Sequence, residues 1–257
     1  MRQPVLFISH GSPMRALEGG AWGDALRGLG QSLDPVAILV VSAHWETEGA
    51  PRVTASPQPG VIHDFYGFPE PLYGLDYPSP GSLPLAERIL ACLRKTGIEA
   101  VLDPERPLDH GAWAPLIHLF PKADRPVLQL SEPLERTPRS LYAMGQALAQ
   151  LREEGLLIIG SGGIVHNLRR LEWGSEAAPE AWAGNFDAWA ASRLEAGDAD
   201  ALLDWRRKAP DPALAHPRSE HWDPLFAALG AAGDAKPRTV FEGWEHRNLS
   251  LRSLIWD

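Results

Sequence analysis

Short apolar runs without polar alternation are the feature that most restricts the fold of this chain. Two of them occupy residues 5–9 (VLFIS) and 36–42 (VAILVVS), and a histidine follows each within two residues, His10 and His44. Strands that are apolar on both faces are typical of a largely parallel sheet with helices on both faces. Ligands bind such sheets beyond the carboxyl ends of the strands, where both histidines are expected to lie.

Helical patterns separate the apolar runs. We predict strands at residues 5–9, 36–42, 52–55, 126–130, 156–160, 239–242 and 251–256, and helices at 84–95, 113–120, 139–154, 181–196 and 221–232. Because strands and helices alternate, the sequence predicts a single α/β domain over residues 1–257 with a largely parallel or mixed central sheet. Residues 56–82 are rich in Pro, Gly and aromatic residues and have no period, and a loop of this length is usually functional.

Charge and cysteine content exclude several classes of function. The net charge is −9 and the basic residues are scattered, which argues against nucleic acid as a partner. No stretch approaches the roughly 20 apolar residues of a membrane helix, and we expect a cytoplasmic protein with no membrane partner. The single cysteine, Cys92, leaves no thiolate cluster, so a metal ion would have to be held by His, Asp or Glu.

Three further segments contain histidines of interest. LLIIGSGGIVHNL carries His166 after a glycine-rich turn that lacks the Lys-Ser/Thr ending of a phosphate loop, so we expect its glycines to let the backbone approach a ligand closely. LDHGAWAPL carries His110, and HPRSEHWDPLF carries His221, which we predict to lie in the first turn of a helix. Glu220 and His221 would differ by about 100° around that helix, so only one of them is expected to face a given metal ion.

Six motifs follow one another between residues 9 and 231: SHGSP, SAHW, IHDFYGFPEPLY, LDHGAW, GSGGIVHNL and SEHWDPLFAALGA. Together they resemble the class III extradiol ring-cleaving dioxygenases, specifically the DOPA-dioxygenase-like branch. The resemblance implies one metal ion, Fe(II) for catalysis, at the carboxyl edge of an α/β sheet. It also implies the reaction, in which O₂ opens the ring of a DOPA-like or other single-ring catechol to give a muconic semialdehyde.

The resemblance also assigns roles to individual residues. It places His10 and His44 as metal ligands and His166 as the acid–base residue, with His110 as a further catalytic histidine. The late ligand is a histidine in the nearer branch and a glutamate in the protocatechuate branch, so we choose His221 and keep Glu220 as the alternative. Three neutral imidazoles also suit Zn(II), so the isolated protein is expected to be able to carry zinc.

Aromatic residues beside these positions are candidates for the slot that a flat catechol ring requires. We predict substrate contacts for His63, Phe65, Trp45 and Trp113, although core packing or loop ordering would explain each of them equally well. We interpret His118, His216 and His246 as structural or surface residues.

Two other functions remain open from the sequence. A zinc-dependent hydrolase would use the three histidines to activate water, but the chain has no HExxH segment. A non-catalytic metal-binding protein would keep the same fold. The presence of all the proposed metal and acid–base histidines favours the dioxygenase, which would bind a small aromatic diol and O₂ and act as a monomer or homodimer.

Overall fold

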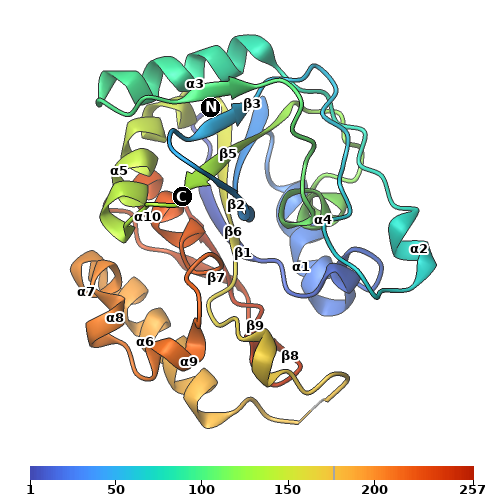
Figure 1. The fold of residues 1–257 in the computed structure, drawn as a ribbon, viewed down its shortest axis with the longest axis vertical. Coiled ribbons are helices and arrows are strands. Elements are labelled where there is room, and N and C mark those ends of the chain that lie inside the picture. Colours follow the sequence, from blue (N-terminus) through green and yellow to red (C-terminus); the bar gives the residue numbers. More distant parts are fainter. Residues whose placement is uncertain (176) are drawn as a thin grey trace.

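A mixed sheet of eight strands runs through the computed structural model, which describes residues 1–175 and 177–257 (Figure 1). The strand order is β4-β3-β5-β2-β6-β1-β10-β7. These strands are β1 (Val5–Ser9), β2 (Ala37–Thr47), β3 (Arg52–Thr54), β4 (Val101–Asp103), β5 (Val127–Pro133), β6 (Leu156–Gly162), β7 (Arg238–Phe241) and β10 (Ser253–Trp256). A separate pair consists of β8 (Trp244–Glu245) and β9 (Leu249–Ser250).

The centre of the sheet is parallel, and an antiparallel pair joins it to each flank, β3 with β5 on one side and β10 with β1 on the other. Strands β5, β2, β6 and β1 are parallel neighbours, whereas β10 runs antiparallel to β1 and β7 antiparallel to β10. Every residue of β1 and β6 is buried, as expected for strands covered on both faces. The predicted α/β fold is thus confirmed, with a mixed sheet.

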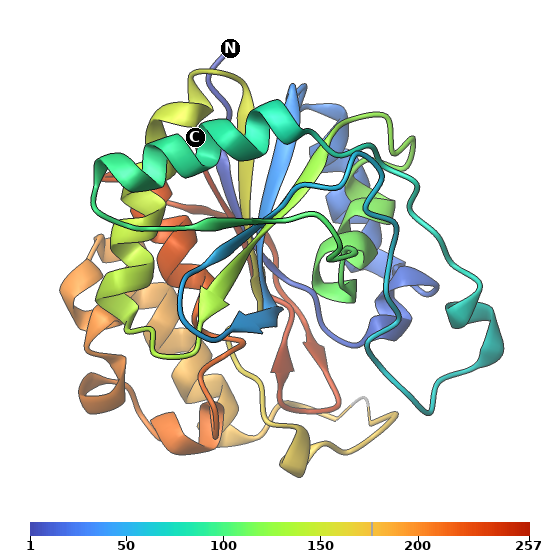
Figure 2. The same cartoon turned by 45° about the horizontal axis from the view of Figure 1, so that its top comes forward.

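Helices cover both faces of the sheet (Figure 2). Successive residues of β1 alternate between two cores, because Leu6 and Ile8 pack with the side of α1 and α4, and Val5 and Phe7 with the side of α3, α5 and α10. The α-helices are α1 (Gly20–Gln31), α2 (Glu70–Tyr73), α3 (Leu83–Lys95), α4 (His110–Leu119), α5 (Pro138–Leu148), α6 (Ala181–Ala196), α7 (Ala199–Leu203), α8 (Trp205–Lys208), α9 (Pro212–Ala215) and α10 (Pro224–Ala232).

Three short 3₁₀ helices, Pro13–Ala16, Ala149–Arg152 and Leu168–Arg170, complete the helical elements of the described residues. The predicted helix over residues 139–154 is in fact two elements, because α5 ends at Leu148 and the 3₁₀ helix Ala149–Arg152 follows it. Within the described residues, no helix combines the length and the apolar character needed to cross a membrane.

Helix α1 was not predicted, because its sequence GAWGDALRGLGQ contains four glycines and therefore has low helix propensity. The structure explains two of them by close packing on α4. A Cβ at Gly30 would lie 1.8 Å from the Leu119 carbonyl oxygen, and one at Gly23 would lie 3.1 Å from the His118 ring. These glycines let the two helices approach closely. Burial of Trp22 and Leu26 stabilises α1 and so offsets the low helix propensity of its glycines.

Candidate metal centre

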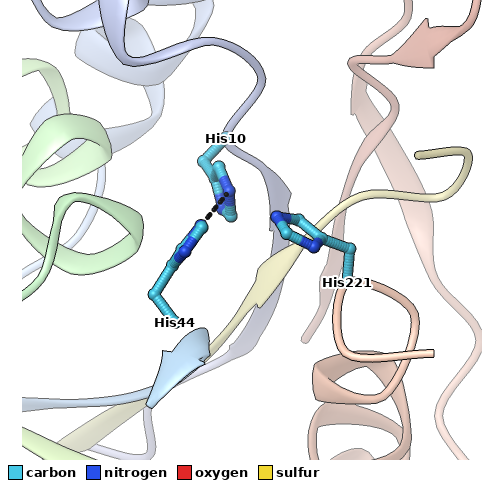
Figure 3. Close-up of side chains that lie close together, drawn as sticks. All are labelled: His10, His44 and His221. Carbon is cyan, nitrogen blue, oxygen red and sulfur yellow. Dashed lines mark hydrogen bonds between the residues drawn. The ribbon is translucent and has the colours of Figure 1, made fainter. Parts of the chain in front are cut away.

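Three histidines from distant parts of the chain meet at the carboxyl edge of the sheet. His10 follows β1, His44 lies in β2, and His221 precedes α10, and their rings point toward one another (Figure 3). One ring nitrogen of each lies within 4.8 Å of those of the other two, and His10 Nε2 is 3.1 Å from His44 Nε2. The structure thus brings together the three residues chosen as ligands.

His10 is held in one tautomer by a chain of hydrogen bonds. The Ser161 hydroxyl donates its only hydrogen to the Gly111 carbonyl oxygen at 2.5 Å. It must therefore accept from His10 Nδ1–H, which is 3.0 Å away. The lone pair of His10 is then on Nε2, the nitrogen that faces His44.

His44 lies in an irregular part of β2 rather than beyond its end. The prediction ended this strand at residue 42, but β2 continues to Thr47. Its pairing with β5 changes register between Val41↔Leu130 and Glu46↔Glu132. Such bulges re-aim side chains, and here the bulge directs His44 toward His10.

His221 lies in a turn and not in the first turn of a helix, which corrects the prediction. The N–H groups of Trp222 and Asp223 both donate to the Ser219 carbonyl oxygen, and α10 begins only at Pro224. Proline is favoured at the first helical position because its missing N–H has no partner there in any helix. Glu220 Oε1 accepts from His221 Nδ1 at 3.2 Å, which leaves the lone pair of His221 on Nε2.

Glycines at the end of β6 make room for the segment that carries His221. A Cβ at Gly162 would lie 2.1 Å from the His221 carbonyl oxygen, and one at Gly160 would lie 2.4 Å from that of Pro224. The Gly163 N–H donates to the same His221 oxygen at 2.8 Å. These glycines therefore accommodate another segment of the chain, whereas the sequence suggested that they accommodate a ligand.

We expect Gly162→Ala to lower the free energy of unfolding by about 1–3 kcal/mol, because the added methyl group must displace the backbone of His221. Gly184→Ala in α6 is the matched control, since among the described residues no heavy atom lies within 4 Å of the Cβ it would add, and it is expected to stabilise the protein by roughly 0.5–1 kcal/mol. Urea unfolding of both variants measures the difference. Equal stability of the two variants would contradict the packing role of Gly162.

All three histidines are in the neutral form that metal binding requires. Burial lowers the pKa of His10, His44 and His221 well below the usual value, and the neighbouring histidines lower it further. A metal–nitrogen distance of about 2.0–2.1 Å places two ligand nitrogens about 3.0–3.4 Å apart, and the His10–His44 separation falls in that range. The donor set therefore fits a divalent transition-metal ion.

Beside this cluster, the buried His110 pairs with Asp64, whose side chain is partly exposed. Asp64 Oδ1 accepts from His110 Nδ1 at 2.9 Å and from the His110 N–H at 3.0 Å, at the start of α4. Burial acts to raise the pKa of Asp64, but its bonds to His110 outweigh this and hold the pKa well below the usual range. The His110 ring is 4.0 Å from that of His44, centroid to centroid. Asp64 was not predicted, and its only signal in the sequence is its place in the IHDFYGFPEPLY motif.

His166 lies flat against His221. Their ring centroids are 3.4 Å apart and the ring planes differ by 6°. Burial lowers the pKa of His166 to about 3, with contributions from His216 and His110, so the ring is neutral at pH 7. His166 is not among the three nitrogens that face one another, but it forms a second close group with Glu220 and His221.

A cavity of about 660 Å³ opens above these rings. All five histidines discussed above line it, which is consistent with a site that holds a metal ion and a small ligand together. The loop over residues 56–82 contributes Phe65, Tyr66 and Phe68, and the opposite wall contains Leu168, Leu171, Trp173 and Leu249.

Three predicted substrate contacts lie outside this lining. Among the described residues that line the cavity, Phe65 is present but His63, Trp113 and Trp45 are not. His63 and Trp113 pack behind Phe65, with ring centroids 5.6 and 6.2 Å from it, so they support its position. Trp45 is buried beneath the Arg106 guanidinium. Their contact with substrate therefore stays a prediction, to which this lining gives no support.

Of the histidines interpreted as structural or surface residues, two are buried outside the site. His118 Nε2 donates to the Arg15 carbonyl oxygen, and His216 Nε2 donates to that of Ile164. His246 differs, because it lines the cavity together with Arg15 and Glu245. Sequence reasoning missed these three lining residues.

Comparisons with known proteins connect this arrangement to a reaction. Residues 4–253 match the family model described as the catalytic LigB subunit of aromatic ring-opening dioxygenase. The chain is 40% identical to a 4,5-DOPA dioxygenase extradiol of Escherichia coli (98% of this chain, 94% of the relative) and 41% identical to one of Beta vulgaris (97% and 94%). The crystal structure of an uncharacterised Escherichia coli K12 protein superimposes with a TM-score of 0.85 at 35% identity, over 100% of both chains.

Proposed function

Since the chain belongs to the LigB family of aromatic ring-opening dioxygenases, we propose that it opens a single-ring catechol with a short polar side chain, similar to DOPA, to a muconic semialdehyde. That it is a metal-dependent extradiol dioxygenase acting on an aromatic substrate with O₂ follows from the family and from the names of its relatives. The observation that carries the proposal is the convergence of His10, His44 and His221 on one cavity.

We assign the metal to these three histidines and propose Fe(II) as the catalytic ion. Bound there, iron would supply Lewis acidity toward the catechol oxygens and a route for electrons from the ring to O₂. Three protein ligands leave coordination positions open, as a site that takes both substrates requires. The same imidazoles suit Zn(II), so zinc in the isolated protein would be compatible with this assignment.

His166 is the proposed proton-transfer residue. A catechol must lose a proton to bind a metal ion through both oxygens, and a neutral histidine accepts it. His166 is neutral at pH 7, and its ring forms part of the cavity wall next to His221. In the cationic form it can return the proton later in the cycle.

His110 is the second proposed catalytic histidine. Its Nδ1–H donates to Asp64, so its Nε2 is an acceptor. His110 Nε2 can therefore accept a hydrogen bond from a substrate hydroxyl. It lies on the side of His44, whereas His166 lies on the side of His221.

The cavity wall supports a substrate that is apolar at one end and polar at the other. Phe65 and Phe68 offer ring faces and edges to a flat aromatic ring. Arg15, Glu245 and His246 also line the cavity and suit a polar side chain. We further propose a cytoplasmic protein that acts as a monomer or homodimer.

The substrate proposal predicts faster cleavage of DOPA or dihydroxyphenylpropionate than of 1,2-dihydroxynaphthalene, because the naphthalene diol lacks the polar side chain that Arg15, Glu245 and His246 in the cavity lining suit. The measurement is O₂ uptake, with the absorbance of the yellow product, after anaerobic loading with Fe(II). Faster turnover of the naphthalene diol would contradict the substrate assignment. Turnover of an ester without O₂ uptake would instead indicate a hydrolase.

A further inference from the structure

The main chain of His44 is held by side chains, because the neighbouring strand does not hold it. Between positions 41 and 46 of β2 the strand loses its register with β5, and its pairing with β6 ends at Ser42↔Ser161. The His44 N–H donates to the Ser42 hydroxyl oxygen at 3.2 Å. Arg106 Nη2 donates to the His44 carbonyl oxygen at 3.1 Å. Both peptide groups of this proposed ligand therefore depend on side-chain partners.

These two partners meet at one buried carboxylate, that of Asp109. The Ser42 hydroxyl donates to Asp109 Oδ1 at 2.7 Å, and Arg106 Nη2 is 3.6 Å from Asp109 Oδ2. Gln129 completes the cluster, since its Nε2 donates to Oδ2 at 2.8 Å and its Oε1 accepts from the Asp109 N–H at 3.0 Å. The Asp109 side chain is fully buried.

Asp109 makes these contacts in place of the role that its position favours. It is the N-cap residue of α4, where an aspartate normally accepts from the first free N–H groups of the helix. Its side chain caps none of them, and the His110 N–H is bound by Asp64 instead. The carboxylate instead faces Ser42 and Arg106, the two residues that bond to the main chain of His44. This orientation indicates a role at the metal centre.

We propose that Asp109 is a positioning residue, which fixes His44 for metal binding through Ser42 and Arg106. This inference rests on the proposed function, because it takes His44 as a ligand. Hydrogen-bonded supports of metal ligands are typically worth 10–100-fold in metal affinity. Asp109 also precedes His110, so the same carboxylate ties the bulge of β2 to the start of α4.

The test measures metal binding and does not depend on turnover. The full chain is stripped of metal and titrated with Co(II) alone against a competing chelator, and the visible spectrum of the bound Co(II) is recorded. We expect Asp109→Asn to weaken Co(II) binding by about 10–100-fold and to alter the spectrum. The amide has a similar size, but it lacks the charge that faces Arg106, and its NH₂ group has to face a donor of Ser42 or Gln129.

Asp187→Asn is the matched control. Asp187 is also buried and accepts from a serine hydroxyl, Ser250, and from an arginine, Arg252. Among the described hydrogen bonds, neither partner bonds to the main chain or to the ring of His10, His44 or His221, whereas both Ser42 and Arg106 bond to the main chain of His44. This variant is expected to lose stability but to bind Co(II) within about twofold of the wild-type affinity, with an unchanged spectrum.

The outcomes distinguish failure of the positioning role of Asp109 from failure of the proposed metal site. Co(II) affinity of Asp109→Asn that stays within twofold of wild type, or that falls no further than in Asp187→Asn, would overturn the positioning role. A wild-type chain that binds no Co(II) would overturn the proposed metal site itself. If Asp109→Asn does not fold, Ser42→Ala removes the hydroxyl that joins the His44 N–H to Asp109 but keeps the carboxylate, and it is expected to weaken binding and change the spectrum in the same direction.

Discussion

His10→Ala is expected to lose the bound metal ion and ring cleavage together. His10 offers Nε2 as the donor because Ser161 holds its Nδ1–H, and alanine leaves two protein ligands where three converge. The loss of activity should therefore exceed the 10–100-fold that loss of a supporting hydrogen bond costs. Metal content after Fe(II) loading and gel filtration, measured beside O₂ uptake, checks this. His44→Ala and His221→Ala are expected to behave in the same way.

Glu220→Ala is the control for the third ligand. Glu220 accepts from His221 Nδ1, so its removal is expected to lower metal affinity moderately but to leave stoichiometric binding at saturating Fe(II). If His221→Ala instead retained full occupancy while Glu220→Ala lost it, the glutamate would be the ligand. Retention of metal by His10→Ala would place the metal centre elsewhere.

The second large effect is expected from His166→Ala. General acid–base residues typically contribute about 10²–10⁴-fold to rate, so turnover should fall by that order. Metal content and anaerobic catechol binding should persist, because His166 stacks on His221 and is not among the three nitrogens that face one another. Fe(II) titration and anaerobic binding of the catechol are measured beside steady-state O₂ uptake.

His118→Ala provides the comparison for His166→Ala, because His118 is a buried histidine of α4 that bonds to the Arg15 carbonyl oxygen. This variant is expected to be less stable with turnover close to wild type. Near-normal turnover in His166→Ala would refute the acid–base role. Loss of metal in that variant would make His166 a ligand.

The central strands could be predicted because burial on both faces leaves an unbroken apolar run in the sequence. VLFIS and LLII carry this signal, and both form fully buried parallel strands. The sequence of α1 carries no such signal. Gly23 and Gly30 are required by the close approach of α4, which only the folded structure shows. The short strand β4 and the helices α7–α9, which were not predicted, depend on tertiary packing in the same way, whereas β3 was predicted as residues 52–55.

The site could be predicted where a motif marks a residue, and not where the contact partner is distant in sequence. Asp64 acts on His110, and nothing in either segment indicates that they meet. Trp45 shows a different reason. Once β2 is known to continue to Thr47, neighbouring side chains point to opposite faces, so His44 and Trp45 cannot both line the cavity. Ending the strand at residue 42 concealed this alternation.

Strand β1 lies between β6 and β10, so the strand that carries His10 is synthesised first and receives its last partner near the end of the described chain. A nascent chain that stops before residue 219 has His10 and His44 but lacks the turn that brings His221 onto β6. The three histidines can therefore converge only after residue 221 has been synthesised and its turn has packed against β6.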